Sequence, residues 1–453
     1  IYTSDVSSAA SDVYKRQVYG IPEEEIREVS DALSHLPDPW PDILQWARRL
    51  AGTPRHLSVH CGGVVITPDP LPERVPVEQA PKGVPIIQWD KDITEAAGLV
   101  KIDLLGNRSL AVVRDALASI EANYGTHISY AQLNPLEDAK TQEMLAQGDT
   151  VGVFYVESPA MRQLLKKTGQ GDFAHLVVQS SIIRPAANEF IREYVRRDRG
   201  GTYEPLHPML AEILEETHGI LCYQEDVSRV AMALAGFDAV QADQLRKILS
   251  KKHKQARLPD YRDRFFRGAL ARGVAREVIE EVWRMILSFQ GYSFCKPHSA
   301  SYALVSFKAC YLRAHFPAEF MAAVISNQGG YYTTMAYLSE ARRMGLTILP
   351  PDVNASTLPY AGYGGNLRVG LMQLKGVQEA SLEALLEERA RGGPFGSLEE
   401  ILGRVDLDPA DLRVLIKAGC LDSIARGRSR PELLWELLAW EARAKGVRGQ
   451  GSG

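Results

Sequence analysis

Hydrophobic and polar positions alternate in a short segment near residue 100, and this period of two predicts a β-strand. In LVKIDL, from Leu99 to Leu104, the strand would place Lys101 and Asp103 on one face and the apolar side chains on the other. A second strand is predicted at residues 64–66 (VVI), which follow a Gly-Gly pair. We therefore expect a small sheet with one polar and one apolar face.

The spacing of apolar residues becomes that of helices beyond this strand. Gly106 predicts a turn, and Asn107 or Ser109 predicts the N-cap of a helix that extends to about Asn123. Residues from about 135 to 350 have mostly helical patterns. The prolines of ILPPDVNAS (348–356) predict a linker, after which short helices alternate with glycine turns. The expected fold class is α+β, predominantly helical.

Composition narrows the class of protein. The chain has 453 residues, 45% of them hydrophobic and 24% charged, which is typical of a globular protein with two to four domains. No apolar run is long enough to cross a bilayer, and no signal-peptide pattern stands at the start, so no membrane partner is expected. The five cysteines form no C-x-x-C pair, which argues against a disulfide framework or a zinc site and fits a cytoplasmic location.

Charge is unevenly distributed along the chain. The net charge is −4, but residues 246–276 carry +9, which leaves −13 for the rest. Such asymmetry indicates one cationic surface that could bind a polyanion, although a solvated helix face with dispersed basic residues would give the same count. Five basic residues open this segment and are candidates for gripping a triphosphate or a nucleic-acid backbone: Arg246, Lys247, Lys251, Lys252 and Lys254.

The polar face of the first predicted strand carries candidate chemistry. A carboxylate at a strand end, here Asp103, is a hard oxygen ligand suited to Mg²⁺, and Lys101 could meet the phosphates that the metal carries. The alternative interpretation is an ion pair on a half-buried sheet.

A second candidate site lies at the start of a predicted helix, FCKPHSASYALVSFKACYLRAHF (294–316). Pro297 suits the first helical turn, with Lys296 just before it, and His298 and Tyr302 at i and i+4 share one face. A helix N-terminus favours phosphate, and a tyrosine ring can pack against a base or sugar. An exposed polar helix start would show the same residues. An apolar stripe at positions 305, 309, 312 and 316 predicts that the rest of the helix is core.

One further motif suggests contact with DNA. LKGVQEAS (374–381) resembles a helix-hairpin-helix turn, in which Gly376, after Lys375, would let backbone N–H groups approach a phosphate. Many helix pairs turn at such a motif, so a single copy is a weak signal.

Several segments together resemble the C-family DNA polymerases, the bacterial DNA polymerase III alpha subunits. The resembling blocks stand in the family's order between about residues 50 and 423: HLSVHCGGVVI, GLVKIDLLG, GDTVGVFYVES, GILCYQEDVSRVAMALAGF, ADQLRKILSKK, FCKPHSASYALVSFKACYLRAHFPAEFMAA and RRMGLTILPPDVNAS. The stretches HLSVH, IIQWDKD and SNQGGYYTTMAYLSEARRMGL are similar to the error-prone, translesion branch.

The resemblance implies a role for each candidate residue. Asp103 matches the last of three catalytic, metal-binding palm aspartates, and Lys101 matches a palm lysine that faces the phosphates. The other matching positions face the incoming nucleotide from the fingers: Arg246, Lys247, Lys296, His298 and Tyr302. The expected DNA-binding residues are Lys251, Lys252, Lys254, Lys375 and Gly376.

The family fold also implies a domain order. Residues 1–17 contain SSAASDVYKRQ, which is similar to a sequencing adapter, so they are set apart as a disordered artefact and the gene is expected to continue upstream. The remaining ranges are expected to be the end of the thumb (18–50), the closing part of a nucleotidyltransferase-like palm (51–107), helical fingers (108–350), a tandem helix-hairpin-helix domain (351–430), and a truncated helix with a disordered tail (431–453).

The implied function is template-directed transfer of a nucleotide from a dNTP to a primer 3′-hydroxyl, in DNA replication or error-prone repair synthesis. Two Mg²⁺ ions, primer-template DNA and, for the full-length parent, a sliding clamp and other replisome or mutasome subunits are the implied cofactors and partners. Because two of the three aspartates are missing, this chain alone is expected to be inactive while binding DNA and dNTP. Two alternatives are a non-catalytic nucleic-acid-binding scaffold and an unrelated Mg²⁺-dependent nucleotidyltransferase. Departures from the family pattern include RPAANE in place of the usual R-P-G-P, and Lys247 where a second arginine is common.

Overall fold

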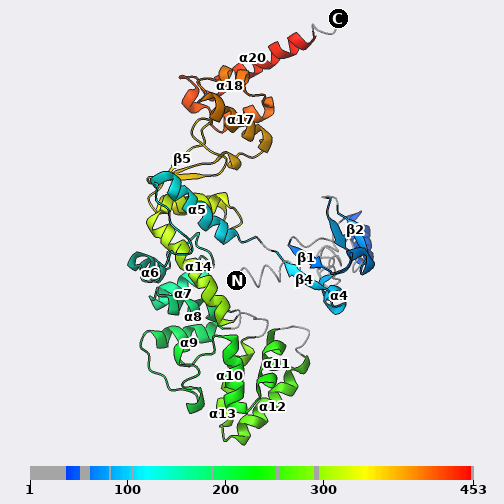
Figure 1. Ribbon diagram of the computed structural model, residues 1–453, viewed down its shortest axis with the longest axis vertical. Helices are drawn as coiled ribbons and strands as arrows, with labels where there is room; N and C mark the ends of the chain where they lie inside the picture. Colours follow the sequence, from blue (N-terminus) through cyan, green and yellow to red (C-terminus); the bar gives the residue numbers. More distant parts are fainter. Residues whose placement is uncertain are drawn as a thin grey trace. The chain divides into compact units, whose positions relative to one another are not determined.

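The computed structural model describes residues 37–50, 62–80, 83–104, 106–184, 187–250, 256–289 and 295–449. The chain divides into two units, Ile1–Asn107 and Arg108–Gly453 (Figure 1), and each is described by itself. The adapter-like residues 1–17 lie outside the described part. The boundary between the units falls where the palm part was expected to end, although the domain assignments themselves stay predictions.

The first unit contains two small antiparallel sheets. β1 (Gly63–Ile66) pairs with β4 (Val100–Asp103), so that Val65 lies opposite Lys101 and Gly63 opposite Asp103. β2 pairs with β3 in the second sheet. The strand predictions near residues 64 and 100 are therefore confirmed. The unit's other elements are α3 (Trp40–Leu50), η1 (Leu71–Glu73), β2 (Val77–Gln79), β3 (Pro85–Ile87) and α4 (Lys91–Ala96).

The second unit is predominantly helical, as the sequence predicts. Its first helix, α5 (Arg108–Tyr124), begins and ends within one residue of the expected positions. The helices that follow, with two short 3-10 turns, are α6 (Ala139–Ala146), α7 (Pro159–Thr168), α8 (Phe173–Ile182), α9 (Asn188–Asp198), η2 (Pro208–Leu210), η3 (Glu215–Thr217), α10 (Gln224–Ala235), α11 (Ala239–Ser250), α12 (Leu258–Ala271), α13 (Arg276–Leu287), α14 (Lys296–His315), α15 (Pro317–Ser326) and α16 (Thr334–Arg343).

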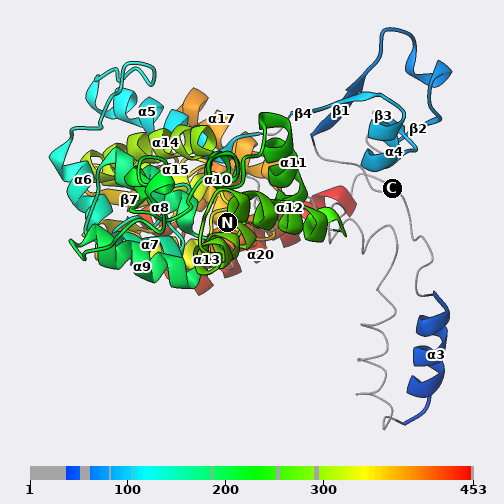
Figure 2. The ribbon, with the colours of Figure 1, turned by 90° about the horizontal axis from the view of Figure 1, so that it is seen from below.

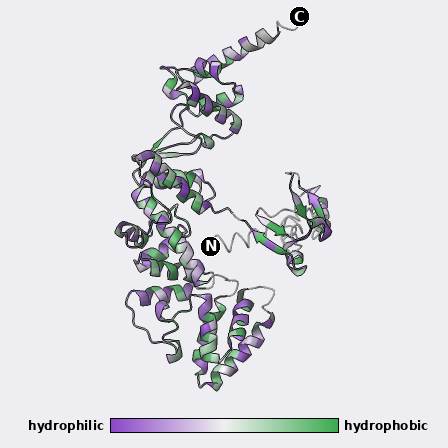
Figure 3. Cartoon of the chain, in the orientation of Figure 1, coloured by the Kyte–Doolittle hydropathy of each residue, from purple (hydrophilic) through white to green (hydrophobic). Residues whose placement is uncertain are grey.

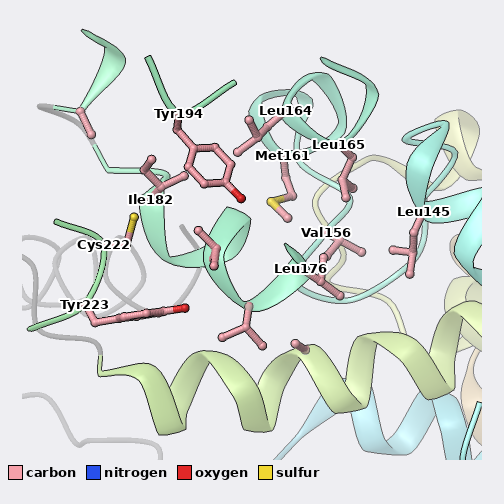
Figure 4. Packing of buried hydrophobic residues seen from close by; sticks show 14 of the residues in the cluster. Leu145, Val156, Met161, Leu164, Leu165, Leu176, Ile182, Tyr194, Cys222 and Tyr223 are labelled. Carbon is pink, nitrogen blue, oxygen red and sulfur yellow. The ribbon is translucent and has the colours of Figure 1, made fainter. Parts of the chain in front are cut away.

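One hydrophobic core runs through these helices, from Val112 to Leu367. Helix α14 packs against α5, α6, α8 and α15, while α10, α11, α12 and α13 pack on one another as a group (Figures 1 and 2). Figure 4 shows part of this core, where Leu145, Leu165 and Leu176 come together from α6, α7 and α8. Hydrophobic and hydrophilic residues alternate along the helices (Figure 3), as expected when one side of each faces a neighbour.

Helix α14 is buried more completely than its apolar stripe predicts. Ala309 and Leu312 are buried, but Lys308 and Arg313 are buried as well. The Nζ of Lys308 donates to the backbone oxygen of Tyr130 (2.6 Å), and the Nε of Arg313 donates to the backbone oxygen of Val151 (3.0 Å). Because these polar groups are satisfied internally, the helix can turn charged positions toward the core.

The C-terminal part of this unit has its own hydrophobic core, from Val353 to Leu437. A three-stranded sheet of order β5-β7-β6 precedes most of it, with β5 parallel and β6 antiparallel to β7. Its elements are β5 (Thr347–Leu349), β6 (Ala361–Tyr363), β7 (Asn366–Arg368), η5 (Leu371–Gln373), α17 (Glu379–Gly392), α18 (Leu398–Arg404), α19 (Pro409–Lys417), η6 (Asp422–Ile424) and α20 (Arg430–Gly449).

One expectation for this part needs correction. Residues 348–356 are not a free linker, because Ile348 lies in β5 and the side chains of Val353 and Ser356 are fully buried. Helix α20 extends to Gly449, and the residues after it lie outside the described part of the chain.

Candidate nucleotide-binding site

Lys101 and Asp103 lie on the same face of β4, as the alternating pattern predicts. The Nζ of Lys101 is 2.9 Å from Asp103 Oδ1 and donates to Oδ2 at 3.1 Å. The Asp103 side chain is 45% exposed, so its carboxylate remains open to solvent. The structure thus shows the ion pair of the alternative interpretation, in a form that leaves carboxylate oxygen accessible to a cation.

The second predicted site lies at the start of α14. The helix begins at Lys296 itself, one residue earlier than expected, and Pro297 is in the first turn. The Lys296 side chain forms an ion pair with Glu216 and lies over the ring of Tyr223, with Nζ 5.1 Å from the ring centroid. Its backbone N–H donates to Glu225 Oε2 at 3.3 Å. Glu216 therefore pairs with the Lys296 ammonium group, and Glu225 accepts the backbone N–H of the same residue.

His298 and Tyr302 come together one turn into the same helix. Their ring centroids are 4.2 Å apart. Burial lowers the pKa of the His298 imidazole below its usual value, so the ring is neutral at pH 7 and presents one N–H donor. The Tyr302 ring also contacts the rings of Phe154 and Tyr155, at centroid distances of 5.1 and 5.5 Å, and both of these residues lie in the loop before α7.

Arg246 and Lys247 lie on α11 and share one carboxylate. The Nη2 of Arg246 is 2.8 Å from Asp243 Oδ1, and the Nζ of Lys247 is 2.7 Å from Asp243 Oδ2. Hydrogen bonds from Lys247 and Arg246 hold the pKa of the Asp243 carboxyl below its usual value. Arg246 also donates from Nη1 to Gln224 Oε1 at 3.1 Å.

Helix α10 connects the two cationic groups. Gln224, its first residue, accepts from Arg246, and Glu225, its second residue, accepts from Lys296. Arg246 and Lys296 are separated by 50 positions in the sequence but approach consecutive residues of one helical turn. Two of the residues predicted to bind nucleotide thus each contact the first turn of α10, through different residues of that turn.

A cavity of about 240 Å³ lies beside Lys296. Its charged lining residues are Glu216, Glu225, Asp226, Arg229 and Lys296, and Tyr223 adds an aromatic wall. In the described part of the chain, no group of three or more His, Cys, Asp or Glu side chains is arranged to hold a metal ion. Likewise, none of the described helices combines the length and hydropathy that a membrane span requires.

Three models of protein families match the chain in succession. "Bacterial DNA polymerase III alpha NTPase domain" matches residues 3–106, "Bacterial DNA polymerase III alpha subunit finger domain" matches 109–273, and "Helix-hairpin-helix motif" matches 345–431. The DNA polymerase III subunit alpha of Thermus aquaticus is 37% identical over 413 residues, or 89% of this chain. The chain belongs to the bacterial DNA polymerase III alpha family.

Other members of the alpha family show similar identity. The DNA polymerase III subunit alpha of Mycobacterium leprae is 35% identical over 401 residues, which are 85% of this chain and 34% of that protein. The error-prone DNA polymerase of Corynebacterium efficiens is 35% identical over 407 residues, or 88% and 37%. The chain thus spans about a third of the length of these relatives, and of the Thermus aquaticus protein (34%). Both branches of the family are represented among them.

The residues predicted to bind DNA lie partly outside the described part of the chain. Lys251, Lys252 and Lys254 lie outside the described residues. Lys375 and Gly376 are exposed in a turn between η5 and α17, and Gly376 has a φ of +85°. An ideal Cβ built on Gly376 would meet no atom within 4 Å, so it is the positive φ, rather than crowding, that favours glycine in this alpha-family hairpin region.

Sequence reasoning missed the groups that surround the predicted ones. Glu216, Gln224 and Glu225 contact Lys296 and Arg246, and Tyr155 contacts Tyr302, from positions that no spacing rule connects. The aromatic pair in GVFYVES was the one local signal, because adjacent aromatics that are not in a regular element often pack on a neighbouring helix.

Proposed function

We propose that the chain forms the fingers and the closing part of the palm of a template-directed DNA polymerase, together with a region that binds duplex DNA. The reaction is transfer of a nucleotide from a dNTP to a primer 3′-hydroxyl, in replication or in error-prone repair synthesis. The observation that supports this most directly is the approach of Arg246 and Lys296 to consecutive residues at the start of α10, next to the N-terminus of α14.

The ion pairs at these residues are weak enough for a nucleotide to replace them. The Lys296 and Glu216 side chains are 44% and 46% exposed, and those of Arg246 and Asp243 are 32% and 42% exposed. Ion pairs at such exposed positions stabilise a protein by about 0.2–1 kcal/mol. A triphosphate offers more negative charge and several strong acceptors, so it competes with the carboxylates for the same donors.

Each residue at the start of α14 has a distinct part in holding the nucleotide. Lys296 and Arg246, with Lys247, neutralise the triphosphate. Neutral His298 donates one hydrogen bond to a non-bridging oxygen. Tyr302 provides a flat ring for the base or sugar. Such positioning and charge neutralisation are most of what phosphoryl transfer requires.

Asp103 is the residue proposed to bind metal, with Lys101 beside it. Its exposed carboxylate fits one oxygen ligand of Mg²⁺, which, when bound by a complete set of ligands, supplies charge neutralisation at the reacting phosphate. One carboxylate does not complete a site for two ions. We therefore propose that this chain by itself binds nucleotide but does not polymerise.

The proposal extends to DNA and to other proteins. Lys375 and Gly376, with Lys251, Lys252 and Lys254, would contact the phosphates of primer-template DNA without reading its sequence. The full-length parent would bind a sliding clamp and other subunits of a replisome or mutasome. Substrates of this kind place the activity in the cytoplasm.

The test is binding of a deoxynucleoside triphosphate, dTTP, to the purified chain. Lys296→Ala and Arg246→Ala should each weaken binding about tenfold, because each removes one charge-assisted contact, worth about 1.5–3 kcal/mol. Arg276→Ala is the matched control, since Arg276 forms an exposed ion pair with Glu280 (3.0 Å) on α13, outside the proposed site. Titration calorimetry at low salt measures the affinity.

Two outcomes of this test would contradict the proposal. Folded Lys296→Ala and Arg246→Ala variants that bind dTTP as tightly as the unchanged chain would remove these residues from the site. A chain that binds duplex DNA but no dTTP would instead support the non-catalytic nucleic-acid-binding scaffold.

A further inference from the structure

Tyr155 has an unusual backbone conformation next to the proposed nucleotide site. Its φ is +70°, in the left-handed region that side chains other than glycine, asparagine and aspartate seldom adopt. Among the described residues, the other non-glycine residues with positive φ are His218, Gln328 and Arg426. Strained residues persist where the surrounding structure enforces them, and they concentrate at functional sites.

The loop on both sides of Tyr155 is held by hydrogen bonds. The hydroxyl of Thr150 donates to the backbone oxygen of Val156 (2.7 Å), and the hydroxyl of Ser306 donates to that of Phe154 (2.8 Å). The buried carboxylate of Glu157 accepts from the N–H of Gly152 (3.0 Å) and from the hydroxyl of Tyr337 (2.9 Å). These contacts fix the backbone at either end of the strained residue, so the left-handed conformation is imposed by the fold.

The strained conformation places the Tyr155 ring against α14. Its centroid is 5.5 Å from that of Tyr302 and 5.8 Å from that of Phe154. Its hydroxyl is 3.5 Å from the hydroxyl of Ser299, which is buried and accepts from Ser181 at 2.8 Å. The Tyr155 side chain therefore contacts α14 at Ser299, in its first turn, and at Tyr302, in its second turn.

Four rings form a continuous aromatic wall, defined as Phe154, Tyr155, His298 and Tyr302. All four are partly exposed, unlike fully buried core aromatics such as Phe307. Dense packing alone would not require a strained residue at a partly exposed position. A requirement to hold the Tyr155 ring against Tyr302 would.

We propose that Tyr155 is a positioning residue that holds Tyr302 for recognition of the nucleoside part of the incoming dNTP. This inference rests on the function proposed above and adds a residue that does not itself contact the phosphates. Because every base presents a π-face, such a wall would act on all four nucleotides. The triphosphate would be held by Lys296, Arg246, Lys247 and His298, independently of the contact between Tyr155 and Tyr302.

Because different residues are proposed to bind the nucleoside and the triphosphate, the inference can be tested with two ligands, dTTP and inorganic tripolyphosphate. Tyr155→Asn removes the ring but keeps a residue that tolerates the left-handed conformation, so the loop can still fold. We expect this variant to bind dTTP about tenfold more weakly, the size of one lost stacking contact, and to bind tripolyphosphate within about twofold of the unchanged chain. Tyr155→Phe keeps the ring and should bind dTTP as tightly as the unchanged chain.

Phe266→Ala is the matched structural control. Phe266 is a partly exposed aromatic on α12 that contacts Phe265 and Trp283, at centroid distances of 6.5 and 6.2 Å, outside the aromatic wall. This variant should lower the melting temperature without changing either affinity. The comparison separates loss of aromatic packing in general from loss of the wall.

Four results would overturn the inference. Unchanged dTTP affinity in Tyr155→Asn would show that the ring plays no part in binding. Equal weakening for dTTP and tripolyphosphate, or failure of Tyr155→Phe to restore binding, would show a merely structural role. An unchanged chain that binds neither ligand would remove the proposed function, and this inference with it.

Discussion

Asp226 shows how a single buried carboxyl group shapes the start of α10. It is 4% exposed, and its carboxylate accepts the backbone N–H of Tyr223 at 3.0 Å and that of Cys222 at 3.4 Å. Burial raises the pKa of Asp226 to about 6, although these hydrogen bonds and the charge of Arg229 act in the opposite direction. At neutral pH the Asp226 carboxylate at the start of α10 is therefore ionised, and burial of its charge lowers the stability of the folded chain.

This raised pKa predicts a pH dependence of stability. The unfolded chain has an ordinary aspartate pKa of 3.8 at this position, so between about pH 4 and 6 the folded state binds more protons than the unfolded state. The contribution of Asp226 to stability should therefore increase as the pH falls through 6. Relative to Asp226→Asn, the melting temperature of the unchanged chain should rise between pH 7.5 and pH 5. Parallel changes in the two proteins would contradict the raised pKa.

Contacts of single residues could be predicted only where they are local in sequence. The shared face of Lys101 and Asp103 follows from the period of a strand, and the contact of His298 with Tyr302 follows from that of a helix. The partners of Lys296 are 71 and 80 positions away, and Tyr155 is 144 positions from Ser299. Nothing in local spacing encodes such pairs, because they depend on how the helices pack.

At the scale of elements, α10 and α12 approach each other closely at Gly268. An ideal Cβ at this position of α12 would lie 2.1 Å from the backbone oxygen of Ala235, the last residue of α10. The absence of a side chain at Gly268 thus sets how closely α12 approaches the C-terminal end of α10.

Substitutions at two helical glycines should have opposite effects. Gly268→Ala should lower the free energy of unfolding by about 1–3 kcal/mol, because the backbones must separate. Gly403→Ala, in α18, is the control: no atom lies within 4 Å of its ideal Cβ, and alanine should raise stability by about 0.5–1 kcal/mol. Urea denaturation followed by circular dichroism measures both. A Gly268→Ala variant as stable as the unchanged chain would mean that the helices are less closely packed than described.

Elements were predicted well where several local signals agreed. For β4 the signal was the period of two, and for α5 it was a turn residue followed by a cap and an apolar period. The burial of Lys308 and Arg313 on α14 was missed because their partners come from distant loops. Residues 348–356 were misjudged as a linker because consecutive prolines end a helix but do not prevent burial of the residues after them.

For the whole molecule, the order of family blocks was readable from the sequence, and the arrangement of the two units was not. Block order is a property of the chain itself and agrees with the successive family matches at residues 3–106, 109–273 and 345–431. The placement of Asp103 relative to His298 depends on how two separate units come together, so it remains a prediction.

We expect the purified chain to extend no primer in the presence of Mg²⁺ and all four dNTPs. Asp103 matches one of three palm aspartates in the family pattern, whereas two-ion catalysis requires several ligands. A gel-based extension assay checks this, with the full-length alpha subunit of Thermus aquaticus as positive control. Incorporation by the chain that disappears in Asp103→Asn would show that the chain is catalytically complete.

The small sheet of β5, β7 and β6 has a mechanical consequence. Leu367 in β7 belongs to the first core and Leu371 to the second, only four positions apart. The sheet is fastened to the helices, since Asn123 donates to the oxygen of Gly362 (2.7 Å) and Tyr360 donates to the hydroxyl of Ser326 (2.9 Å). A displacement of the C-terminal core should therefore be transmitted to α5 and α15 through the sheet, because the connection between the two cores is short and hydrogen-bonded.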